Sequence, residues 1–417
     1  MSQPASARWQ RPFFALWTGQ AVSLFGSALV QFALVWWLTD TTRSATVLAV
    51  ATLMAMLPGV VIAPFAGVVV DRFNRRLIMM VSDSLVALTT LALAYLFWSG
   101  VAQPGHVYLA MFIRAAAGVF QYPAMQASTS LMVPAEQLQR VQGFNQMLQG
   151  VMGIVAPPAG ALLLGVLPLP GVLMIDVATA LLGIAPLFFI AVPQPPAQAA
   201  GPRPSFVGEL QAGFRYLVAW RGLFLVALMS VALNFLLNPA GALLPILVTQ
   251  HFGGAQGELA LINSAFSLGL LVGGIALGAW GGFKRRIYTS LFGLLLLGLS
   301  FGALGLVPGN AFWLAVVLAF AASLTTVLVN GPLLAIVQAV VAPEMQGRVF
   351  SLIGSVATAL SPVGLLIAGP VSDAVGVQVW YVVGGLGCLG LGALAFVLRD
   401  IRHLEDHRAE ALAPATP

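Results

Sequence analysis

The chain has 417 residues, 59% of them hydrophobic and only 7% charged, and its mean hydropathy is +0.96. Soluble domains carry about 25% charged residues, so this composition excludes an ordinary soluble protein and predicts one that spans a lipid bilayer. The net charge of +5 does not indicate a nucleic-acid partner, because in a membrane chain the distribution of Lys and Arg carries the information. The single cysteine, Cys388, excludes an internal disulfide and a cysteine-rich metal centre.

Apolar runs of about 20 residues, long enough to cross a ~30 Å hydrocarbon core, recur along the sequence. They predict an all-α membrane protein with twelve transmembrane helices in two bundles. The first six, in an N-terminal bundle of residues 1–192, are expected at 13–39, 46–70, 77–98, 107–132, 140–166 and 171–192. The second six, in a C-terminal bundle of residues 222–398, are expected at 222–249, 258–281, 287–307, 311–341, 349–373 and 377–398.

Residues 193–221 are expected to form a cytoplasmic linker between the bundles. The linker starts Pro-rich, with "PQPPAQAAGPRP", which is typical of a flexible or polyproline-like spacer. Its end is amphipathic and favours a short helix on the membrane surface, with Arg215 and Arg221 among the headgroups. Residues 399–417 are expected to form a cytoplasmic tail.

The basic residues predict the orientation in the membrane. With the N-terminus inside, sixteen of the eighteen Lys and Arg residues fall on the inner side of the predicted spans. Arg43 alone lies in an outer loop, and Arg114 lies within a span. This asymmetry predicts a multi-pass protein of the cell (inner) membrane with both termini in the cytoplasm. The N-terminus, "MSQPASARWQRPFF", lacks a cleavage pattern and is expected to lead into the first helix.

The two halves resemble each other at two places. "FNRR" at 73–76 recurs as "FKRR" at 283–286, and "VPAEQLQRV" at 133–141 recurs as "VAPEMQGRV" at 341–349. The offsets, 210 and 208 residues, are nearly equal, and the segments lie in equivalent predicted loops. Two such matches favour duplicated halves, of the kind in which one bundle rocks against the other.

The stretch "GVVVDRFNRR" at 67–76 places four charges between two apolar segments. It resembles the signature that the major facilitator superfamily carries between its second and third helices. The second copy, "GGFKRR", lacks the Asp–Arg pair, as is common in that family. Over nearly the whole chain the sequence is similar to the macrolide-efflux branch, in stretches such as "WTGQAVSLFGSALVQFALVWWLT", "MIDVATALLG" and "GRVFSLIGS".

Two further motifs carry the resemblance to exporters. Arg114-x-x-x-Gly118 looks like the signature tied to proton coupling. "GIVAPPAG" at 153–160, with Gly153, Pro157 and Gly160, is similar to the signature of drug–proton antiporters, except that Ala156 stands where glycine is usual. The resemblance implies a monomeric exporter of a small amphipathic substrate, driven by the proton motive force without a bound cofactor.

The charged loops suggest a conformational gate. Positive-inside anchoring by anionic lipid explains the arginines of the first loop, most fully Arg75 and Arg76. The resemblance implies that Asp71 latches onto the helix of the other half that begins at "QGRVF" (346–350) when the inner side is closed. A local loop cap is the alternative. Glu136 with Arg140, and Glu344 with Arg348, form i,i+4 pairs at the starts of the two repeated helices. Both pairs are expected to be structural and to lie at the rim of the bundles. The predicted gate comprises Gly67, Asp71, Arg72, Arg75, Arg76, Glu136, Arg140, Glu344 and Arg348.

Arg114 and Asp176 are the predicted proton-coupling residues, because a charge inside a span is costly unless it is partnered. Two alternatives stay open: the residues form a purely structural pair, or Arg114 snorkels outward to the interface. Asp83 is expected to support the loop at 71–76, and Glu258 to start a helix at the outer mouth.

Uncharged amides in the spans suggest the cavity. Together with aromatic rings they suit a large, mostly apolar ligand with scattered hydroxyl and carbonyl groups; the alternative is that they hold helices together. Helix one carries no acid before Asp40, so a basic ligand lacks a counter-ion there. The predicted cavity residues are Gln20, Gln31, Gln121, Asn145, Gln149, Asn234, Asn238, Asn330 and Gln338.

Other classes of protein fit less well. The sequence has no phosphate-binding G-x-x-x-x-G-K-[ST] loop, and none of its four histidines lies within a predicted span. His403 and His407 form an i,i+4 pair in the tail, where a solvated surface is favoured over a metal site. The sequence therefore predicts a proton-coupled exporter of amphipathic drugs such as macrolides, and not an enzyme. Two alternatives remain: an exporter of siderophores or other metabolites, and a proton-independent uniporter or ligand-sensing transceptor.

Overall fold

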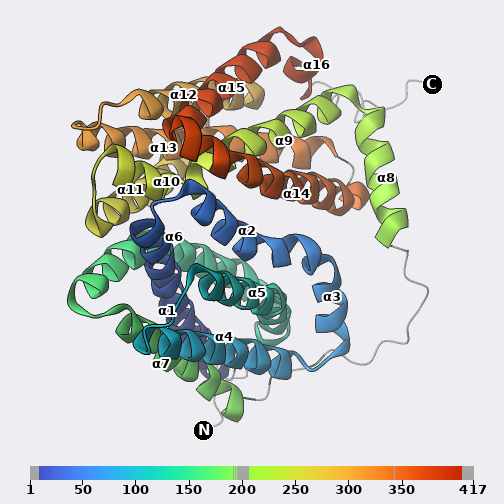
Figure 1. The fold of residues 1–417 in the computed structure, drawn as a ribbon. Helices are drawn as coiled ribbons and strands as arrows, with labels where there is room; N and C mark the ends of the chain where they lie inside the picture. The colour runs from blue at the N-terminus through green and yellow to red at the C-terminus, as the bar shows by residue number, and fades with distance from the viewer. Residues whose placement is uncertain (1–8, 191, 193, 195–205, 342, 406–417) are drawn as a thin grey trace. The chain divides into compact units, whose positions relative to one another are not determined.

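A computed structural model describes residues 9–190, 192, 194, 206–341 and 343–405. All regular secondary structure in these residues is helical (Figure 1). The contacts divide the chain into two compact units. Unit 1 comprises Met1–Ala199 with Ala255–Ser264, and unit 2 comprises Ala200–Gly254 with Ala265–Pro417.

The helices of unit 1 follow the predicted spans closely. They are α1 (Gln10–Thr42), α2 (Ala45–Val61), α3 (Ala63–Arg72), α4 (Arg75–Trp98), α5 (Pro104–Met132), α6 (Ala135–Val166) and α7 (Leu169–Phe189). The predicted single span 46–70 is two helices, which meet at Ile62. Pro64 stands in the first turn of α3, where its missing N–H removes no intrahelical hydrogen bond, so the break falls next to it.

Unit 2 begins with the helix expected at the end of the linker. Its elements are α8 (Phe206–Ala219), α9 (Arg221–Ala242), α10 (Leu244–Ile246), a π-helix (Leu247–His251), α11 (Gln256–Trp280), α12 (Arg286–Leu306), α13 (Phe312–Val340), α14 (Pro343–Val375), α15 (Gln378–Val397) and α16 (Arg399–Arg402). The first residues of α11 belong to unit 1 by their contacts. The predicted span 222–249 extends over α9, α10 and most of the π-helix.

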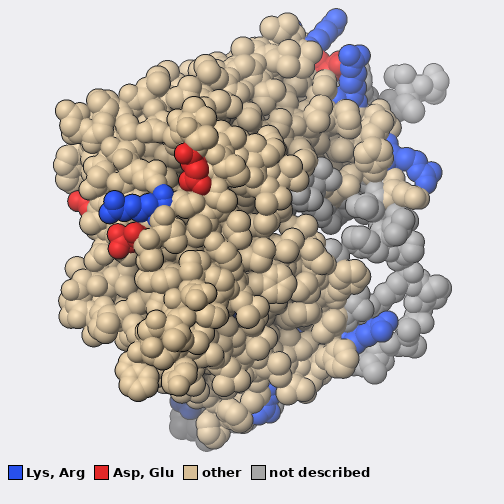
Figure 2. Space-filling view, in the orientation of Figure 1, with Lys and Arg blue, Asp and Glu red and all other residues tan. Residues whose placement is uncertain are grey.

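Every predicted span coincides with helix in the structure. Within the described residues, nine helices are long and apolar enough to cross a membrane. Two shorter apolar helices, Ala45–Val61 and Leu360–Val375, fall in other predicted spans. Uncharged residues cover most of the face seen in Figure 2, and charged side chains are sparse on it. The prediction of an all-α, multi-pass membrane protein is confirmed.

Small residues bring the helices of each unit into close contact. In unit 1, a methyl group on Gly26 of α1 would overlap Thr179 of α7, and one on Gly183 would overlap Ser23. In unit 2, Gly385 of α15 leaves no room for a methyl group against Gly302 of α12. Lipid tails are as apolar as the side chains, so helices in a bilayer associate largely by such close van der Waals packing.

Candidate functional site

Four helices of unit 1 place polar groups opposite one another at two levels. In each helix the two positions are seven residues apart, which keeps them on one face and separates them by ~10 Å along the axis. The first level, which we call the ion-pair layer, contains Ser27 of α1, Thr90 of α4, Arg114 of α5 and Asp176 of α7. The second level, the amide layer, contains Gln20 of α1, Asp83 of α4, Gln121 of α5 and the carbonyl group of Gly183 in α7.

The ion-pair layer holds a fully enclosed carboxylate. The guanidinium of Arg114 lies 2.5 Å from Oδ2 of Asp176, whose side chain is 0% exposed. The hydroxyl of Thr90 donates to the same oxygen at 2.9 Å, and that of Ser27 donates to Oδ1 at 3.1 Å. Arg114 also donates to the hydroxyl oxygen of Thr90. A buried charge requires such partners.

This arrangement decides between two of the sequence-based alternatives. Arg114 points to Asp176, so the interpretation that its side chain snorkels outward to the interface is wrong. The contact between the two residues is the one that the sequence suggests for proton coupling, and a structural pair has the same geometry. The geometry is therefore compatible with both roles.

The amide layer surrounds Asp83, whose side chain is 2% exposed. Gln20 donates from Nε2 to Oδ2 of Asp83 at 2.8 Å and to the carbonyl oxygen of Gly183 at 3.3 Å. Gln121 donates from its Nε2 to Oδ1 of Asp83 and, at 2.8 Å, to Oε1 of Gln20. The expectation that Asp83 supports the loop at 71–76 is wrong, because its carboxylate bonds to these two glutamines.

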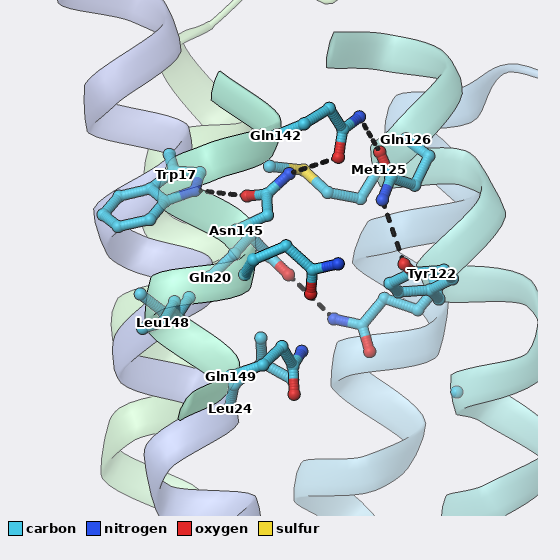
Figure 3. A pocket seen from close by; sticks show the side chains of 14 residues that line it. Trp17, Gln20, Leu24, Tyr122, Met125, Gln126, Gln142, Asn145, Leu148 and Gln149 are labelled. Carbon is cyan, nitrogen blue, oxygen red and sulfur yellow. Dashed lines mark hydrogen bonds between the residues drawn. The ribbon is translucent and has the colours of Figure 1, made fainter. Parts of the chain in front are cut away.

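A pocket of about 210 Å³ in unit 1 opens beside the amide layer (Figure 3). It is lined by Trp17, Gln20, Ala21, Leu24, Gly118, Gln121, Tyr122, Met125, Gln126, Gln142, Asn145, Gln146, Leu148 and Gln149. The indole N–H of Trp17 donates to Oδ1 of Asn145 at 2.8 Å and joins α1 to α6 across the wall. The polar groups that line the pocket are the side-chain amides, the Trp17 indole N–H and the Tyr122 hydroxyl, and none of the lining side chains is charged.

Four of the predicted cavity residues, Gln20, Gln121, Asn145 and Gln149, line this pocket. Sequence reasoning missed Gln142 and Gln146, although with Asn145 and Gln149 they follow the i, i+3, i+4, i+7 spacing of one helix face. That spacing was the signal that could have found them.

The other predicted cavity residues lie elsewhere. Gln31 is exposed on α1 and does not line the pocket. In unit 2, Asn234 donates to the carbonyl oxygen of Ser230 in its own helix, and Asn238 donates to the hydroxyl oxygen of Ser361 at 2.7 Å. Asn330 and Gln338 are exposed on α13.

Residues 67–76, expected as a loop, form the end of α3 and the start of α4, and two of their three arginines contact other helices. Arg75 is only 7% exposed and donates from Nη1 to the carbonyl oxygen of Ala127, near the end of α5, at 2.8 Å. Arg76 donates to the carbonyl oxygen of Phe188, at the end of α7, at 2.9 Å. Phe188 is among the last four residues of α7, whose carbonyls lack intrahelical donors. A cation near the C-terminus of a helix also interacts favourably with the helix dipole. This corrects the expectation that Arg75 serves as a lipid anchor, because its side chain is buried against protein.

The remaining gate residues are only partly placed. Arg72 is exposed, and a Cβ on Gly67 would meet no atom within 4 Å. The side chains of Asp71, Glu344 and Arg348 lie outside the described part of the structure. Glu136 and Arg140 are exposed, and the guanidinium of Arg140 lies 5.7 Å from the ring centre of Phe144. No ion pair joins Glu136 to Arg140 in the described residues, so the expected i,i+4 pair is replaced by a cation–π contact.

The Gly–Pro motif lies within α6. Pro157 is inside the helix, and a methyl group on Gly160 would come within 2.9 Å of the Phe32 ring of α1. Gly153 precedes Pro157 by one turn of the same helix. In the part of the chain that the structure describes, no three His, Cys, Asp or Glu side chains gather in a way that could hold a metal ion. His407 of the predicted tail pair lies outside that part.

The chain matches known transporters over its whole length. The model of the Major Facilitator Superfamily matches residues 16–240 and 223–416. Macrolide efflux protein A of Streptococcus pyogenes is 32% identical over 397 residues, which cover 95% of this chain and 98% of that protein. Multidrug efflux pump Tap of Mycobacterium tuberculosis is 25% identical over 94% of this chain and 95% of its own. A bacterial homolog of the human lysosomal transporter Spinster, in an inward-facing, unoccupied conformation, shares the fold with a TM-score of 0.69 at 14% identity, covering 99% of this chain and 100% of that one.

Proposed function

Since this chain belongs to the Major Facilitator Superfamily, we propose that it exports amphipathic compounds of the macrolide type in exchange for protons, by alternating access. The observation that carries the proposal is the pair of layers in unit 1: a buried ion pair lies one heptad from amide side chains that line a pocket. The similarity to macrolide efflux protein A and to the pump Tap supports outward transport.

The pocket supports an amphipathic substrate. Its wall combines amide groups with Trp17, Tyr122, Leu24 and Met125. Amides offer both donors and acceptors, and the aromatic and aliphatic side chains cover apolar surface. Such a wall suits an amphipathic ligand with scattered oxygen atoms better than a sugar or a peptide, which call for denser polar contacts.

The ion-pair layer is the proposed site of proton coupling. In the arrangement described, the carboxylate of Asp176 accepts hydrogen bonds from Arg114, Thr90 and Ser27. A proton that binds Asp176 cancels the charge that holds Arg114 and leaves the guanidinium to find other partners. A conformation that offers such partners is then favoured, so the proton shifts the equilibrium between two states of the carrier.

The cell membrane is the proposed location, with both termini in the cytoplasm and a single chain as the working unit. The positive-inside distribution supports this orientation. The junction of α3 and α4 then faces the cytoplasm, where Asp71 acts as the proposed latch of the closed state. Arg75 and Arg76 support the latch by holding the loop to the ends of α5 and α7.

Transport in inside-out vesicles tests the proposal. The vesicles are acidified inside, the pH is followed with a dye, and erythromycin is added, followed by biocides, dyes and siderophores. We expect erythromycin to trigger proton leakage from vesicles that contain the protein, and Arg114→Ala to abolish it. A response only to another compound would keep antiport and discard the macrolide. If no compound moves protons, the antiport proposal fails.

A further inference from the structure

One wall of the pocket in unit 1 carries a continuous chain of hydrogen bonds (Figure 3). Trp17 of α1 donates from its indole N–H to Oδ1 of Asn145 at 2.8 Å, and Asn145 donates from Nδ2 to Oε1 of Gln142 at 3.5 Å. Gln142 donates from Nε2 to Oε1 of Gln126 at 3.2 Å, and Gln126 donates from Nε2 to the hydroxyl oxygen of Tyr122 at 3.0 Å. This hydrogen-bond chain runs from α1 through α6 to α5.

Trp17 fixes the direction of every bond in the chain. An indole N–H only donates, so the carbonyl oxygen of Asn145 must face it, which turns the NH₂ group of Asn145 toward Gln142. An NH₂ group in turn requires an oxygen opposite it, and the same reasoning orients Gln142 and then Gln126. The two ends of an amide have nearly the same shape, so without the indole both directions would satisfy the chain equally.

The fixed direction occupies oxygen atoms and leaves donors unused. The carbonyl oxygen of each amide and the hydroxyl oxygen of Tyr122 each accept one hydrogen bond within the chain. Each amide has two N–H groups and uses one of them in the chain, and the O–H of Tyr122 has no acceptor among the described residues. The side chain of Tyr122 is 64% exposed and lines the pocket. This wall therefore suits ligand oxygen atoms that only accept, such as the carbonyl oxygens of ketones, lactones and esters.

We propose that Tyr122 is a specificity-determining donor that selects ligands with a carbonyl oxygen, and that Trp17 is the positioning residue that makes it donate. A hydroxyl group that accepts a hydrogen bond becomes a stronger donor, because successive bonds polarise one another. The substrates of the proposed exporter are thereby narrowed to amphipathic ketones, lactones and esters. The inference rests on the proposed function for its biological meaning, but it concerns binding and is tested by binding.

Three ligands of one skeleton provide the test. Benzophenone has a carbonyl group that only accepts, diphenylmethanol has a hydroxyl group that donates and accepts, and diphenylmethane has neither. Binding of each radiolabelled compound to the full-length protein in lipid nanodiscs is measured by equilibrium dialysis, with empty nanodiscs subtracted. Partition into lipid is the same for every variant, so it cancels when variants are compared. Failure of export in vesicles, with the binding preferences intact, would refute the proposed antiport alone.

We expect Tyr122→Phe to bind benzophenone about fivefold more weakly than the wild-type protein does, because one hydrogen bond to the ligand is lost. Its affinity for diphenylmethane should be unchanged, since the aromatic ring stays in the wall. Tyr95→Phe is the matched control. Tyr95 of α4 is 62% exposed and does not line the pocket, so all three affinities should stay at their wild-type values.

Trp17→Phe tests the direction of the chain. Removal of the indole N–H allows the chain to reverse, so that Tyr122 donates to Gln126 and offers its oxygen to the ligand. We expect the ratio of the benzophenone affinity to the diphenylmethanol affinity to fall about threefold. A residue that only supports the wall would change the three affinities alike.

Three results would overturn the proposal. The first is a wild-type protein that binds benzophenone without saturation. The second is a Tyr122→Phe protein that keeps the wild-type affinity for benzophenone, or that loses affinity for all three ligands equally. The third is a Trp17→Phe protein with the wild-type ratio of benzophenone to diphenylmethanol affinity, which would show that the indole does not set the direction in which Tyr122 bonds.

Discussion

In unit 1 the third and sixth helices of the bundle, α4 and α7, meet across Thr90 and Asp176, which share a hydrogen bond of 2.9 Å. In unit 2 the third and sixth helices, α12 and α15, meet at Gly302 and Gly385, where the backbones leave no room for a methyl group. By the offset of 210 residues between the repeated loops, Gly293 of unit 2 is the sequence equivalent of Asp83. Gly293 packs against Leu328 of α13. Polar layers in one half thus correspond to close glycine contacts in the other.

The two kinds of contact differ in their response to protonation. A buried carboxylate with an arginine or two glutamines changes its energy greatly when a proton binds. A glycine contact between backbones has no group that titrates and resists deformation because interiors are close-packed. Under the proposed antiport, the buried carboxylates of the two layers in unit 1 are the candidate proton-binding groups, and the equivalent glycine contacts of unit 2 offer none.

Breaking the ion pair should have the largest effect. Arg114→Ala leaves Asp176 enclosed without its cation, and removing one partner of a buried pair typically costs about 3–5 kcal/mol. We expect a lower yield of folded protein and a clearly lower thermal unfolding temperature in detergent, together with loss of pH-driven export. Asp176→Asn should destabilise similarly, because it leaves Arg114 unpaired.

The double variant Arg114→Leu/Asp176→Leu separates stability from coupling. It removes both charges, so we expect it to recover most of the unfolding temperature that either single variant loses. Export driven by a proton gradient should stay absent. A double variant that unfolds at the wild-type temperature and still exports with pH dependence would make the pair purely structural.

The glycine contact of unit 2 should be the next most sensitive. Gly385→Ala places a methyl group against Gly302, and overpacking of this kind typically costs about 1–3 kcal/mol. Gly390→Ala, on the same helix, is the matched control, because nothing lies within 4 Å of the position its methyl group takes. Thermal unfolding should separate the two variants. Equal unfolding temperatures would show that α12 and α15 adjust and do not form a rigid contact.

The repeated arginines allow a comparison at equivalent positions. Arg75 is buried and donates to the carbonyl oxygen of Ala127, whereas its counterpart Arg285 is exposed. Arg75→Ala removes this hydrogen bond from a buried, charged donor, at a cost of about 1–2 kcal/mol. Arg285→Ala should cost less than half as much in the same unfolding assay. A larger loss at Arg285 would contradict the assignment of the structural role to the first loop.

The helices and the ion pair could be predicted from the sequence, because each depends on a signal that is visible in the sequence alone. Long apolar runs leave few alternatives to helix in a bilayer. Arg114 stood out because charges within spans are rare, and Asp176 was the acid at a matching depth. The break at Ile62 followed from Pro64, which a reading of hydropathy alone passes over.

The partners of Asp83 could not be predicted from the sequence. Its place early in a predicted span suggested a partner in the neighbouring loop, but the structure turns it toward Gln20 and Gln121. The spacing of seven between Gln20 and Ser27, and between Arg114 and Gln121, was visible in the sequence. The register between helices was not, because it is set by packing such as that of Gly26 against Thr179.

The hydrogen bond between Asn238 and Ser361 should have the smallest effect. It joins α9 to α14 within unit 2 at 2.7 Å, and such bonds between membrane helices average about 0.6 kcal/mol. Asn238→Ala and Ser361→Ala should each lower the unfolding temperature slightly, and the double variant should lose less than the sum of the two, since both remove this bond. Fully additive losses would mean that each residue has separate partners. A loss as large as that of Arg114→Ala would show that unit 2 also depends on its polar groups, which would remove the contrast between the two halves.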